Sequence, residues 1–403
     1  MKDLIMRDLY ICSGKYHLFN AVLLKMLDNK DKIGDLMICD CFEDAKQLYE
    51  RMISFSDKFG NEKLFEKIIF LNHQVYEELN LCELKRISEK IKYYISSKVL
   101  SPHNRLDDLL IYPYSGIYIA GIVPPMIEYC LFAKRQYNSE IMLFDDGMGS
   151  RLQWKKPSLR VRVTDYCRIT KFWKSLKCKY FFSPQMVCDV YPNVPIVEQC
   201  KPLEQNVRMK GVNWPDTVEK LNYIFDYNDK SDLLMNDYIV YFSAGFDLYQ
   251  RLSRYSQTES ILVNEIGSRF VGFVAKKHPN STEPYNSDII CLDKDLMPEM
   301  LFLNTDIENK ILISSGSATI FNPVFIYKKN PYVILTYKLF DSDGGLAEEL
   351  FGYSGEELDK RIYKTLISGY TDQSKVSIPK TMDELNEVLN EYLCRIKNIS
   401  TSQ

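Results

Sequence analysis

The stretch Leu9-Tyr-Ile-Cys12, followed by Ser13-Gly14-Lys15-Tyr16-His17 and by a segment from Leu18 to Leu27, decides the fold class. The first run is apolar and predicts a buried strand. The second is polar and predicts a loop, and the third carries apolar residues at helical spacing. A strand, a loop and a helix in this order are typical of the opening of an α/β domain.

The same alternation continues through the first half of the chain. We expect further strands at residues 36–39, 67–71, 108–112 and 140–144, and helices at residues 43–55 and 76–100. Apolar strands that alternate with helices indicate a parallel sheet with both faces covered.

A second alternation begins after a polar stretch punctuated by prolines. Its strands are expected at residues 238–242, 270–275, 288–292, 310–313 and 332–335. This pattern predicts two α/β domains, residues 1–190 and 236–375, joined by a connection at 191–235. The amphipathic last helix, residues 382–396, lies in a terminal segment, 376–403, that we expect to cross back to the first domain.

Length and composition fit two soluble globular domains. The chain has 403 residues, of which 46% are hydrophobic and 26% charged, and its net charge of −3 gives no overall attraction to nucleic acid. Charges at the N-terminus and the lack of a long apolar run predict a cytoplasmic protein. The 11 cysteines are odd in number and scattered, which predicts reduced thiols.

One stretch departs from the even charge balance. Residues 151–179 contain ten Lys and Arg and one acid, Asp165, interleaved with aromatic side chains such as Trp154 and Trp173. Such a run is most often a solvated face. The alternative is a surface that meets an anionic glycan or membrane, which would place the protein peripherally at the inner face of the cell membrane.

Three polar stretches each follow a predicted strand, and the first is Asp145-Asp146-Gly147. Gly147 permits a tight turn and the close approach of a ligand. Two adjacent carboxylates raise each other's proton affinity, which helps one of them to take a proton from a hydroxyl near neutral pH. Taken alone, Asp-Asp-Gly is more often only a turn.

The second stretch, His278-Pro279, follows Lys276 and Lys277. Pro279 disfavours helical backbone at His278 and so keeps it extended at the strand end. The lysines make the surroundings cationic. Such an imidazole could protonate a leaving phosphate oxygen while a lysine pairs with a nucleotide. A histidine of a surface loop is the alternative.

The third stretch, Ser314-Ser315-Gly316-Ser317, offers hydroxyl and N–H donors to a phosphate. An ordinary capped turn uses the same residues. Between the second and third stretches, Pro298-Glu299 indicates in the first place a helix start.

In this order, Asp145-Asp146-Gly147, Lys276-x-His278-Pro279, Glu299 and Ser314-Ser315 resemble the motifs of bacterial sialyltransferases. These include glycosyltransferase family 52, the bacterial polysialyltransferases and their family 80 relatives. The opening from Ser13 to Asn20 is similar to their N-terminal strand, loop and helix.

The resemblance implies the GT-B fold, in which two Rossmann-like domains face a central cleft, with the acceptor on the first domain and the nucleotide-sugar on the second. It implies that Asp145 is the general base, with Asp146 as the alternative, and that His278 is the acid. It further implies that the donor side comprises Lys276, Pro279, Glu299, Ser314 and Ser315, and the acceptor side Asp146, Gly147, Ser13 and Gly14.

The reaction so implied is an inverting transfer of sialic acid from CMP-sialic acid to a glycan hydroxyl of a bacterial capsule or lipooligosaccharide. Its single phosphate can leave with the help of a cationic histidine and hydroxyl donors, so we expect no metal and no other cofactor. Asp341-Ser-Asp343, the nearest to a metal-binding D-x-D, is expected in a loop. The alternatives are a GT-B enzyme that uses another nucleotide-sugar and a non-catalytic protein of polysaccharide assembly.

Overall fold

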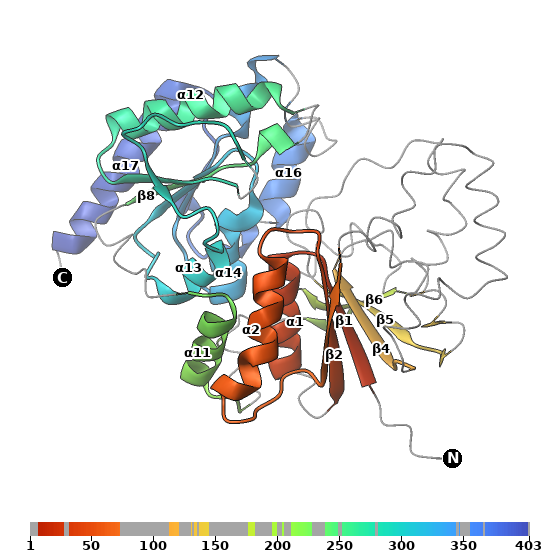
Figure 1. Ribbon diagram of the computed structural model, residues 1–403. Helices are drawn as coiled ribbons and strands as arrows, with labels where there is room; N and C mark the ends of the chain where they lie inside the picture. Colours follow the sequence, from red (N-terminus) through yellow and green to blue (C-terminus); the bar gives the residue numbers. More distant parts are fainter. Residues whose placement is uncertain are drawn as a thin grey trace, which may run out of the picture. The chain divides into compact units, whose positions relative to one another are not determined.

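The structure is a computed structural model of the chain. The residues that it describes are 7–27, 32–72, 113–120, 130, 133–134, 137–144, 176–181, 196–199, 204, 211–227, 238–248, 252–278, 281–343, 346, 355–365 and 367–401. They form two compact units, drawn in Figure 1. Unit 1 comprises residues 1–150, 156–200 and 205–224, and unit 2 comprises residues 151–155, 201–204 and 225–403.

Unit 1 is built on a parallel sheet in the order β3-β2-β1-β4-β5-β6-β7. The strands are β1 (Arg7–Cys12), β2 (Ile33–Cys39), β3 (Lys67–Leu71), β4 (Gly116–Ala120), β5 (Glu140–Phe144), β6 (Leu176–Phe181) and β7 (Ile196–Gln199). Its described helices are α1 (Lys15–Leu27), α2 (Ala45–Lys58) and α11 (Trp214–Ile224). In Figure 1, α1 and α2 lie side by side on one face of this sheet.

Unit 2 is built on a second parallel sheet in the order β10-β9-β8-β11-β12-β13. The strands are β8 (Ile239–Phe242), β9 (Phe273–Lys276), β10 (Ile290–Leu292), β11 (Ile311–Ser314), β12 (Tyr332–Leu335) and β13 (Val376–Ser377). The described helices are α12 (Arg254–Arg269), α13 (Pro298–Asn304), α14 (Asn322–Tyr327), α16 (Gly355–Thr365) and α17 (Met382–Thr401), with 3-10 turns that include η3 (Phe246–Leu248), η4 (Ala318–Phe321) and η5 (Tyr337–Asp343).

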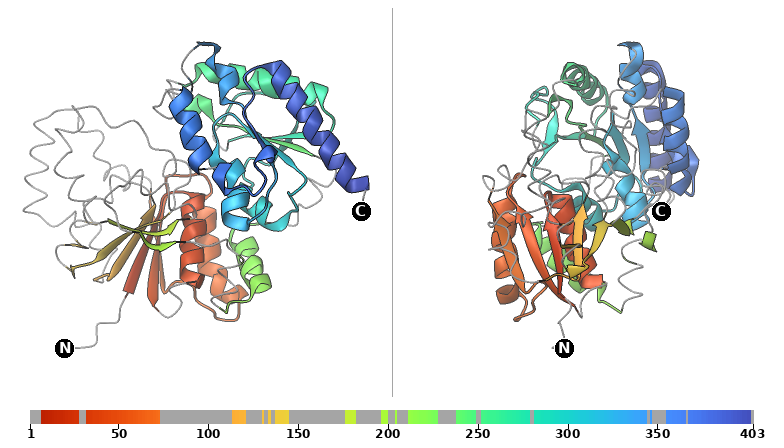
Figure 2. Two further views of the ribbon diagram at one scale, coloured as in Figure 1. Left: turned by 180° about the vertical axis from the view of Figure 1, so that it is seen from behind. Right: turned by 90° about the vertical axis from the view of Figure 1, so that its right-hand side faces the viewer.

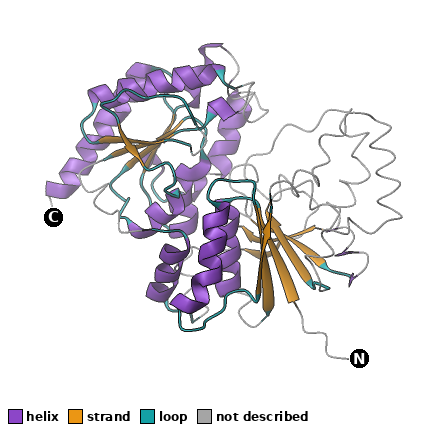
Figure 3. Ribbon diagram, in the orientation of Figure 1, coloured by secondary structure: helices purple, strands orange, loops and turns teal. Residues whose placement is uncertain are grey.

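Helices cover both faces of the unit 2 sheet, as the views in Figure 2 and the colouring in Figure 3 show. Right-handed crossovers explain this arrangement, because the chain leaves β8 toward β9 and β10 and later leaves β11 in the opposite direction. The strands are accordingly apolar on both sides: β8, β9, β11 and β12 are buried throughout.

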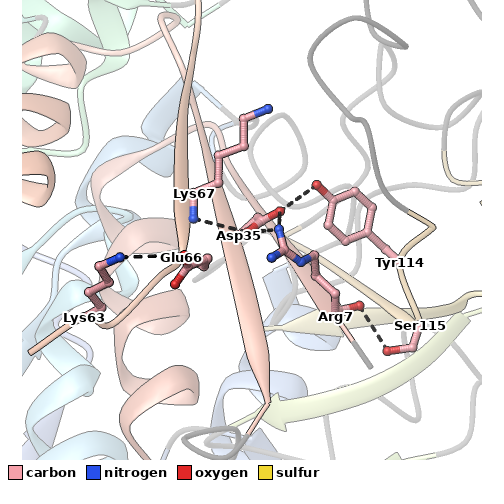
Figure 4. Close-up of polar contacts among 7 residues, drawn as sticks. All are labelled: Arg7, Asp35, Lys63, Glu66, Lys67, Tyr114 and Ser115. Atoms are coloured by element: carbon pink, nitrogen blue, oxygen red, sulfur yellow. Dashed lines mark hydrogen bonds and ion pairs between the residues drawn. The ribbon is translucent and has the colours of Figure 1, made fainter. Parts of the chain in front are cut away.

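A buried ion pair joins β1 and β2 near their amino ends, as Figure 4 shows. Asp35 is fully buried, and its carboxylate accepts from the Arg7 guanidinium at 2.9 and 3.1 Å and from the Tyr114 hydroxyl at 2.9 Å. The Lys67 amide donates to the same carboxylate at 3.2 Å. These contacts bring the starts of β1, β2, β3 and the segment before β4 together.

The fold class predicted from the sequence is confirmed, since both units are Rossmann-like and the chain has the two-domain composition of the GT-B class. The strands expected at residues 67–71, 140–144 and 332–335 match β3, β5 and β12. The strand expected at 108–112 and the helix expected at 76–100 lie outside the described residues. The sequence did not predict β4, β6, β7 or β13.

The domain limits differ from the expected ones. The unit 1 sheet extends to β7, inside the stretch 191–235 that was expected to connect the domains, and α11 also belongs to unit 1. α17 belongs to unit 2, where Tyr392 packs on Tyr332 with ring centroids 4.6 Å apart. Its expected crossing to the first domain stays a prediction. Within the described part of the chain, no helix is long and apolar enough to cross a membrane.

Candidate functional site

The sheet of unit 2 reverses its strand order between β8 and β11, and a candidate site lies there. β9 and β10 extend the sheet beyond β8, whereas β12 and β13 extend it beyond β11. Ligands of open α/β sheets bind outside the carboxyl ends of the strands at such a switch point. Two loops leave the sheet at this place: residues 243–245 after β8, and residues 314–317, which begin with the last residue of β11.

The 243–245 loop brings the backbone against a histidine. Gly245 has a φ of +66°, which favours glycine. A Cβ atom added to Gly245 would lie 2.8 Å from Cγ of His278. A glycine is therefore needed at position 245 for two reasons: the positive φ of its backbone and the close approach of the His278 imidazole.

His278 follows β9, the strand next to β8, and the loop that continues from it is fixed to η3. Asp247 Oδ2 accepts from the Thr282 amide at 2.7 Å and from the Ser281 hydroxyl at 3.1 Å. The Ser281 amide in turn donates to the carbonyl of His278 at 2.9 Å. The imidazole thus stands on a loop with several anchors, at the carboxyl edge of the sheet.

The electrostatic surroundings of His278 differ from the sequence expectation of a cationic ring. Burial lowers the pKa of His278 below its ordinary value, the charge of Lys276 lowers it further, and Asp247 acts in the opposite direction. Without an anion beside it, the imidazole is therefore neutral at neutral pH. A bound phosphate would favour the cation and raise this pKa.

The two lysines before His278 occupy defined positions. Lys276, the last residue of β9, is 4% exposed, and its ammonium donates to the carbonyls of Lys277 at 2.9 Å and Lys294 at 2.7 Å. The Lys277 ammonium donates to the carbonyl of Glu283 at 2.8 Å and lies 4.6 Å from the ring centroid of Tyr285. A contact of Lys276 with a nucleotide stays a prediction.

Ser314 and Ser315 are both fully buried, and their hydroxyls make hydrogen bonds within the protein. The Ser314 hydroxyl accepts from the amides of Ser317 at 2.9 Å and Gly316 at 3.3 Å. The Ser315 hydroxyl lies 2.7 Å from that of Tyr241 and 3.0 Å from that of Thr336. The described role of the pair is to shape the loop, and its contact with phosphate stays a prediction.

Glu299 connects two helices of unit 2. Its carboxylate accepts from the Asn322 amide group at 2.6 Å, and its carbonyl accepts from the Tyr327 hydroxyl at 2.7 Å. Glu299 lies in α13, which begins with Pro298 as the sequence indicates, whereas Asn322 and Tyr327 belong to α14. The side chain is 5% exposed, and its contact with a ribose stays a prediction.

The residues expected on the acceptor side fall in unit 1. Ser13 directly follows β1, and both its amide and its hydroxyl contact Nδ1 of His17, at 3.2 and 3.1 Å. The Gly14 carbonyl accepts the first helical bond of α1, from Leu18, at 3.1 Å. The stretch Asp145-Asp146-Gly147 comes next after β5 but lies outside the described residues, as do Pro279 and most of the basic stretch 151–179.

Sequence reasoning missed three residues of the unit 2 site: Gly245, Asp247 and Glu259. The glycine in Ser243-Ala-Gly245 was a readable signal, because it follows a predicted strand just as the glycine of Ser13-Gly14 does. Glu259 was readable as an acid on the apolar face of α12, between Tyr255 and Val263. Nothing in the sequence pairs Asp247 with the loop after β9.

The described residues include no group of three or more His, Cys, Asp and Glu side chains that could hold a metal ion. No protein-family model matches the chain, and no curated protein matches it in sequence.

Similar solved structures include the Methanocaldococcus jannaschii UDP-GlcNAc 2-epimerase in complex with UDP-GlcNAc and UDP, with a TM-score of 0.43, 9% identity and coverage of 96% of this chain and 92% of that one. The spinosyn rhamnosyltransferase SpnG with thymidine diphosphate has a TM-score of 0.45 at 9% identity over 98% of this chain and 92% of that one. The calicheamicin glycosyltransferase CalG4 has a TM-score of 0.36 at 10% identity, with coverage of 99% of this chain and 98% of that one. At such identity the likeness concerns the fold, and no substrate or reaction follows from it.

Proposed function

We propose that the chain is an inverting, metal-independent sialyltransferase that moves sialic acid from CMP-sialic acid to a glycan hydroxyl of a bacterial capsule or lipooligosaccharide. The observation that carries the proposal is the position of His278, at the carboxyl edge of the unit 2 sheet and against Gly245 at the switch point. A histidine in this place suits a donor whose leaving group is a nucleoside monophosphate, because one imidazole can serve its single phosphate.

In the proposed reaction, the acceptor hydroxyl gives its proton to Asp145, and its oxygen forms a bond to the anomeric carbon of sialic acid. The bond from this carbon to the phosphate oxygen breaks with inversion, and CMP leaves with a proton from the Nδ1–H or Nε2–H of His278. Because the free ring is neutral at neutral pH, the anionic donor has to recruit that proton when it binds. The resemblance to sialyltransferases, which rests on the motif order, supplies the identity of the donor.

The catalytic roles are tested by Asp145→Ala and His278→Ala. We expect each substitution to lower transfer from CMP-sialic acid to a glycan acceptor by about 10²-fold or more, the scale of losing a general acid or base. Asp288→Asn, in an exposed position before β10, is a matched control that should transfer at the normal rate. Normal turnover of the Asp145 and His278 variants would exclude this mechanism.

A chelator tests the absence of a metal. Because the leaving phosphate is single, its charge needs no bridging cation, and we expect EDTA to leave the initial rate within about twofold of the untreated enzyme. Strict dependence on added Mg²⁺ or Mn²⁺ would contradict the proposal and would favour a diphosphate-sugar donor.

The burial of Ser314 and Ser315 favours a second candidate, a glycosyltransferase of the same fold that uses another nucleotide-sugar. Their hydroxyls are engaged within the protein, so the serine pair does not by itself select CMP over a uridine or thymidine diphosphate. Isothermal titration with CMP, UDP and dTDP separates the two candidates. Binding of UDP or dTDP at least tenfold tighter than CMP would establish the second.

A further inference from the structure

A buried carboxylate beneath the switch point has no role in the proposed reaction. Glu259 of α12 is 3% exposed. Its Oε1 atom accepts from the Tyr241 hydroxyl at 2.9 Å and from the Ala244 amide at 2.9 Å, and its Oε2 atom accepts from the Ser243 hydroxyl at 2.8 Å. These donors lie at the end of β8 and in the 243–245 loop, so the side chain of Glu259 in α12 fixes that loop.

Further hydrogen bonds connect Glu259 to the 314–317 loop. When Glu259 is ionised, Tyr241 donates its one hydroxyl proton to the carboxylate, so the Ser315 hydroxyl, 2.7 Å away, donates to Tyr241. The proton of Ser315 is then used, and Thr336 must donate to Ser315 across 3.0 Å. The hydrogen bonds from Thr336 to Ser315, from Ser315 to Tyr241 and from Tyr241 to Glu259 therefore run in one direction, toward the carboxylate.

The 243–245 loop in turn contacts His278. The Gly245 amide donates to the Ser243 hydroxyl at 3.2 Å, which fixes the turn that Glu259 holds. The imidazole packs against this turn, because a Cβ atom at Gly245 would lie 2.8 Å from Cγ of His278. A displacement of the 243–245 loop would open the contact and expose the ring to water.

We propose that Glu259 is a positioning residue, which holds the 243–245 and 314–317 loops in register with each other and thereby fixes His278 at the switch point. This inference rests on the proposed function, since it explains how the nucleotide site of that function is kept in shape. It assigns Ser315 to the connection between the two loops, through Tyr241.

Three side chains supply the charges and titratable groups that act on Glu259. They are Tyr241 of β8, Tyr285 of the loop after β9 and Asp247 of η3. Burial raises the pKa of Glu259 to about 7, although the hydrogen bonds from Ala244, Ser243 and Tyr241 act in the opposite direction. Burial therefore outweighs the hydrogen bonds in setting this pKa. The three donors nevertheless fix the position of the side chain, and we expect its isosteric replacement to disturb both loops.

The test uses the whole chain without a ligand and compares Glu259→Gln with the matched control Glu265→Gln. Glu265 lies in the same helix, one turn or more away, and pairs with Arg269 on the surface at 2.6 Å. Hydrogen exchange should accelerate about tenfold or more at residues 244–245 and 316–317 in Glu259→Gln, because the amide group has one acceptor oxygen in place of two and sets a donor among the three donors. The control should leave exchange unchanged.

The pKa of His278, followed by NMR of the imidazole, provides a readout that loss of stability alone does not move. Loss of the loop contact exposes the ring, so we expect its pKa to rise toward the ordinary value in Glu259→Gln. Removal of a nearby negative charge would act in the opposite direction. A rise therefore reports the lost contact, and an unchanged or lower pKa would overturn the proposal.

Tyr241→Phe keeps the test decisive if Glu259→Gln does not fold. This variant removes the hydrogen bonds of the Tyr241 hydroxyl to Glu259 and Ser315, so exchange should accelerate at residues 316–317. Ala244 keeps its bond to Glu259 and Gly245 keeps its bond to Ser243, so exchange at residues 244–245 should change less. Equal acceleration throughout unit 2 would overturn the proposal, because Glu259 and Tyr241 would then serve general stability. Titration of the unsubstituted chain with CMP is a separate measurement, and its failure would count against the proposed function alone.

Discussion

At the scale of the residue, His278 should make the binding of a nucleotide depend on pH. Its pKa is lowered in the protein by burial and by Lys276, and a bound phosphate would raise it. At a pH between the pKa of His278 in the free protein and its pKa in the complex, the complex holds a proton that the free protein lacks. The binding of a nucleoside monophosphate should therefore take up a proton at His278, and affinity should fall as the pH rises through the pKa of His278 in the complex.

This prediction can be measured by titrating the protein with CMP at pH 7 in two buffers of different ionisation enthalpy. His278→Gln removes the group, so the proton uptake of the variant should be lower than that of the unsubstituted protein by up to one proton per site. The difference between the two proteins cancels the protons that the CMP phosphate itself exchanges. Equal uptake would show that His278 does not meet the phosphate.

At the scale of the element, the two edges of the unit 1 sheet have different tasks. Ser13 follows β1 at the carboxyl edge, where ligands bind in such folds. The amino edge is closed by Asp35, which joins β1, β2 and β3 through Arg7 and the Lys67 amide. A buried ion pair of this kind is costly to break, because one partner is left without its counter-charge.

We therefore expect Asp35→Asn to lower the free energy of unfolding by about 3 kcal/mol, since Arg7 would lose its carboxylate. Urea denaturation followed by circular dichroism measures this change. The matched control is Glu66→Gln, whose pair with Lys63 in Figure 4 is 3.6 Å long and exposed. The control should change stability by less than about 0.5 kcal/mol. Equal effects of the two substitutions would contradict a structural role for the Asp35 pair.

The strands also show what the sequence could and could not reveal. Local apolar runs predicted β1, β2, β3 and β5, but β4 was missed, because Gly116 and the neighbouring turn residues argue against a strand. The structure gives the reason for the glycine: a Cβ atom at Gly116 would lie 2.7 Å from Oδ1 of Asp8, on the neighbouring β1. β4 therefore depends on contacts with a strand that is distant in the sequence, and such contacts cannot be read from a single sequence.

The same limit applies to the candidate site. The position of His278 at a strand end was predictable from the apolar run before it and from its place in the motif order. Its neutral ring was not, because burial and the distance to Lys276 depend on the folded chain. The sequence likewise suggested hydroxyl donors at Ser314 and Ser315, but only the structure shows that the Ser315 hydroxyl bonds that of Tyr241 and that the Ser314 hydroxyl accepts from the loop amides.

At the scale of the whole molecule, two sheets of similar topology each offer a switch point, between β1 and β4 in unit 1 and between β8 and β11 in unit 2. Their chemistry differs. The ammonium of Lys15 pairs with the Asp44 carboxylate near the first switch point. The charge of Lys276 acts instead on His278 near the second. An anionic nucleotide should therefore bind at the second switch point, which leaves the first for an acceptor.

Hydrogen exchange with saturating CMP tests this division of tasks within one experiment. A ligand at 100 times its dissociation constant stabilises the state that binds it by about 2.7 kcal/mol, which is ample to slow exchange locally. We expect protection in the 243–245 and 314–317 loops and at residues 277–278. The amides of Lys310 and Tyr332, at the opposite edge of the same sheet, are the internal control and should be unchanged. Protection at residues 13–14 without any in unit 2 would reverse the assignment, because the nucleotide would then occupy the switch point of unit 1.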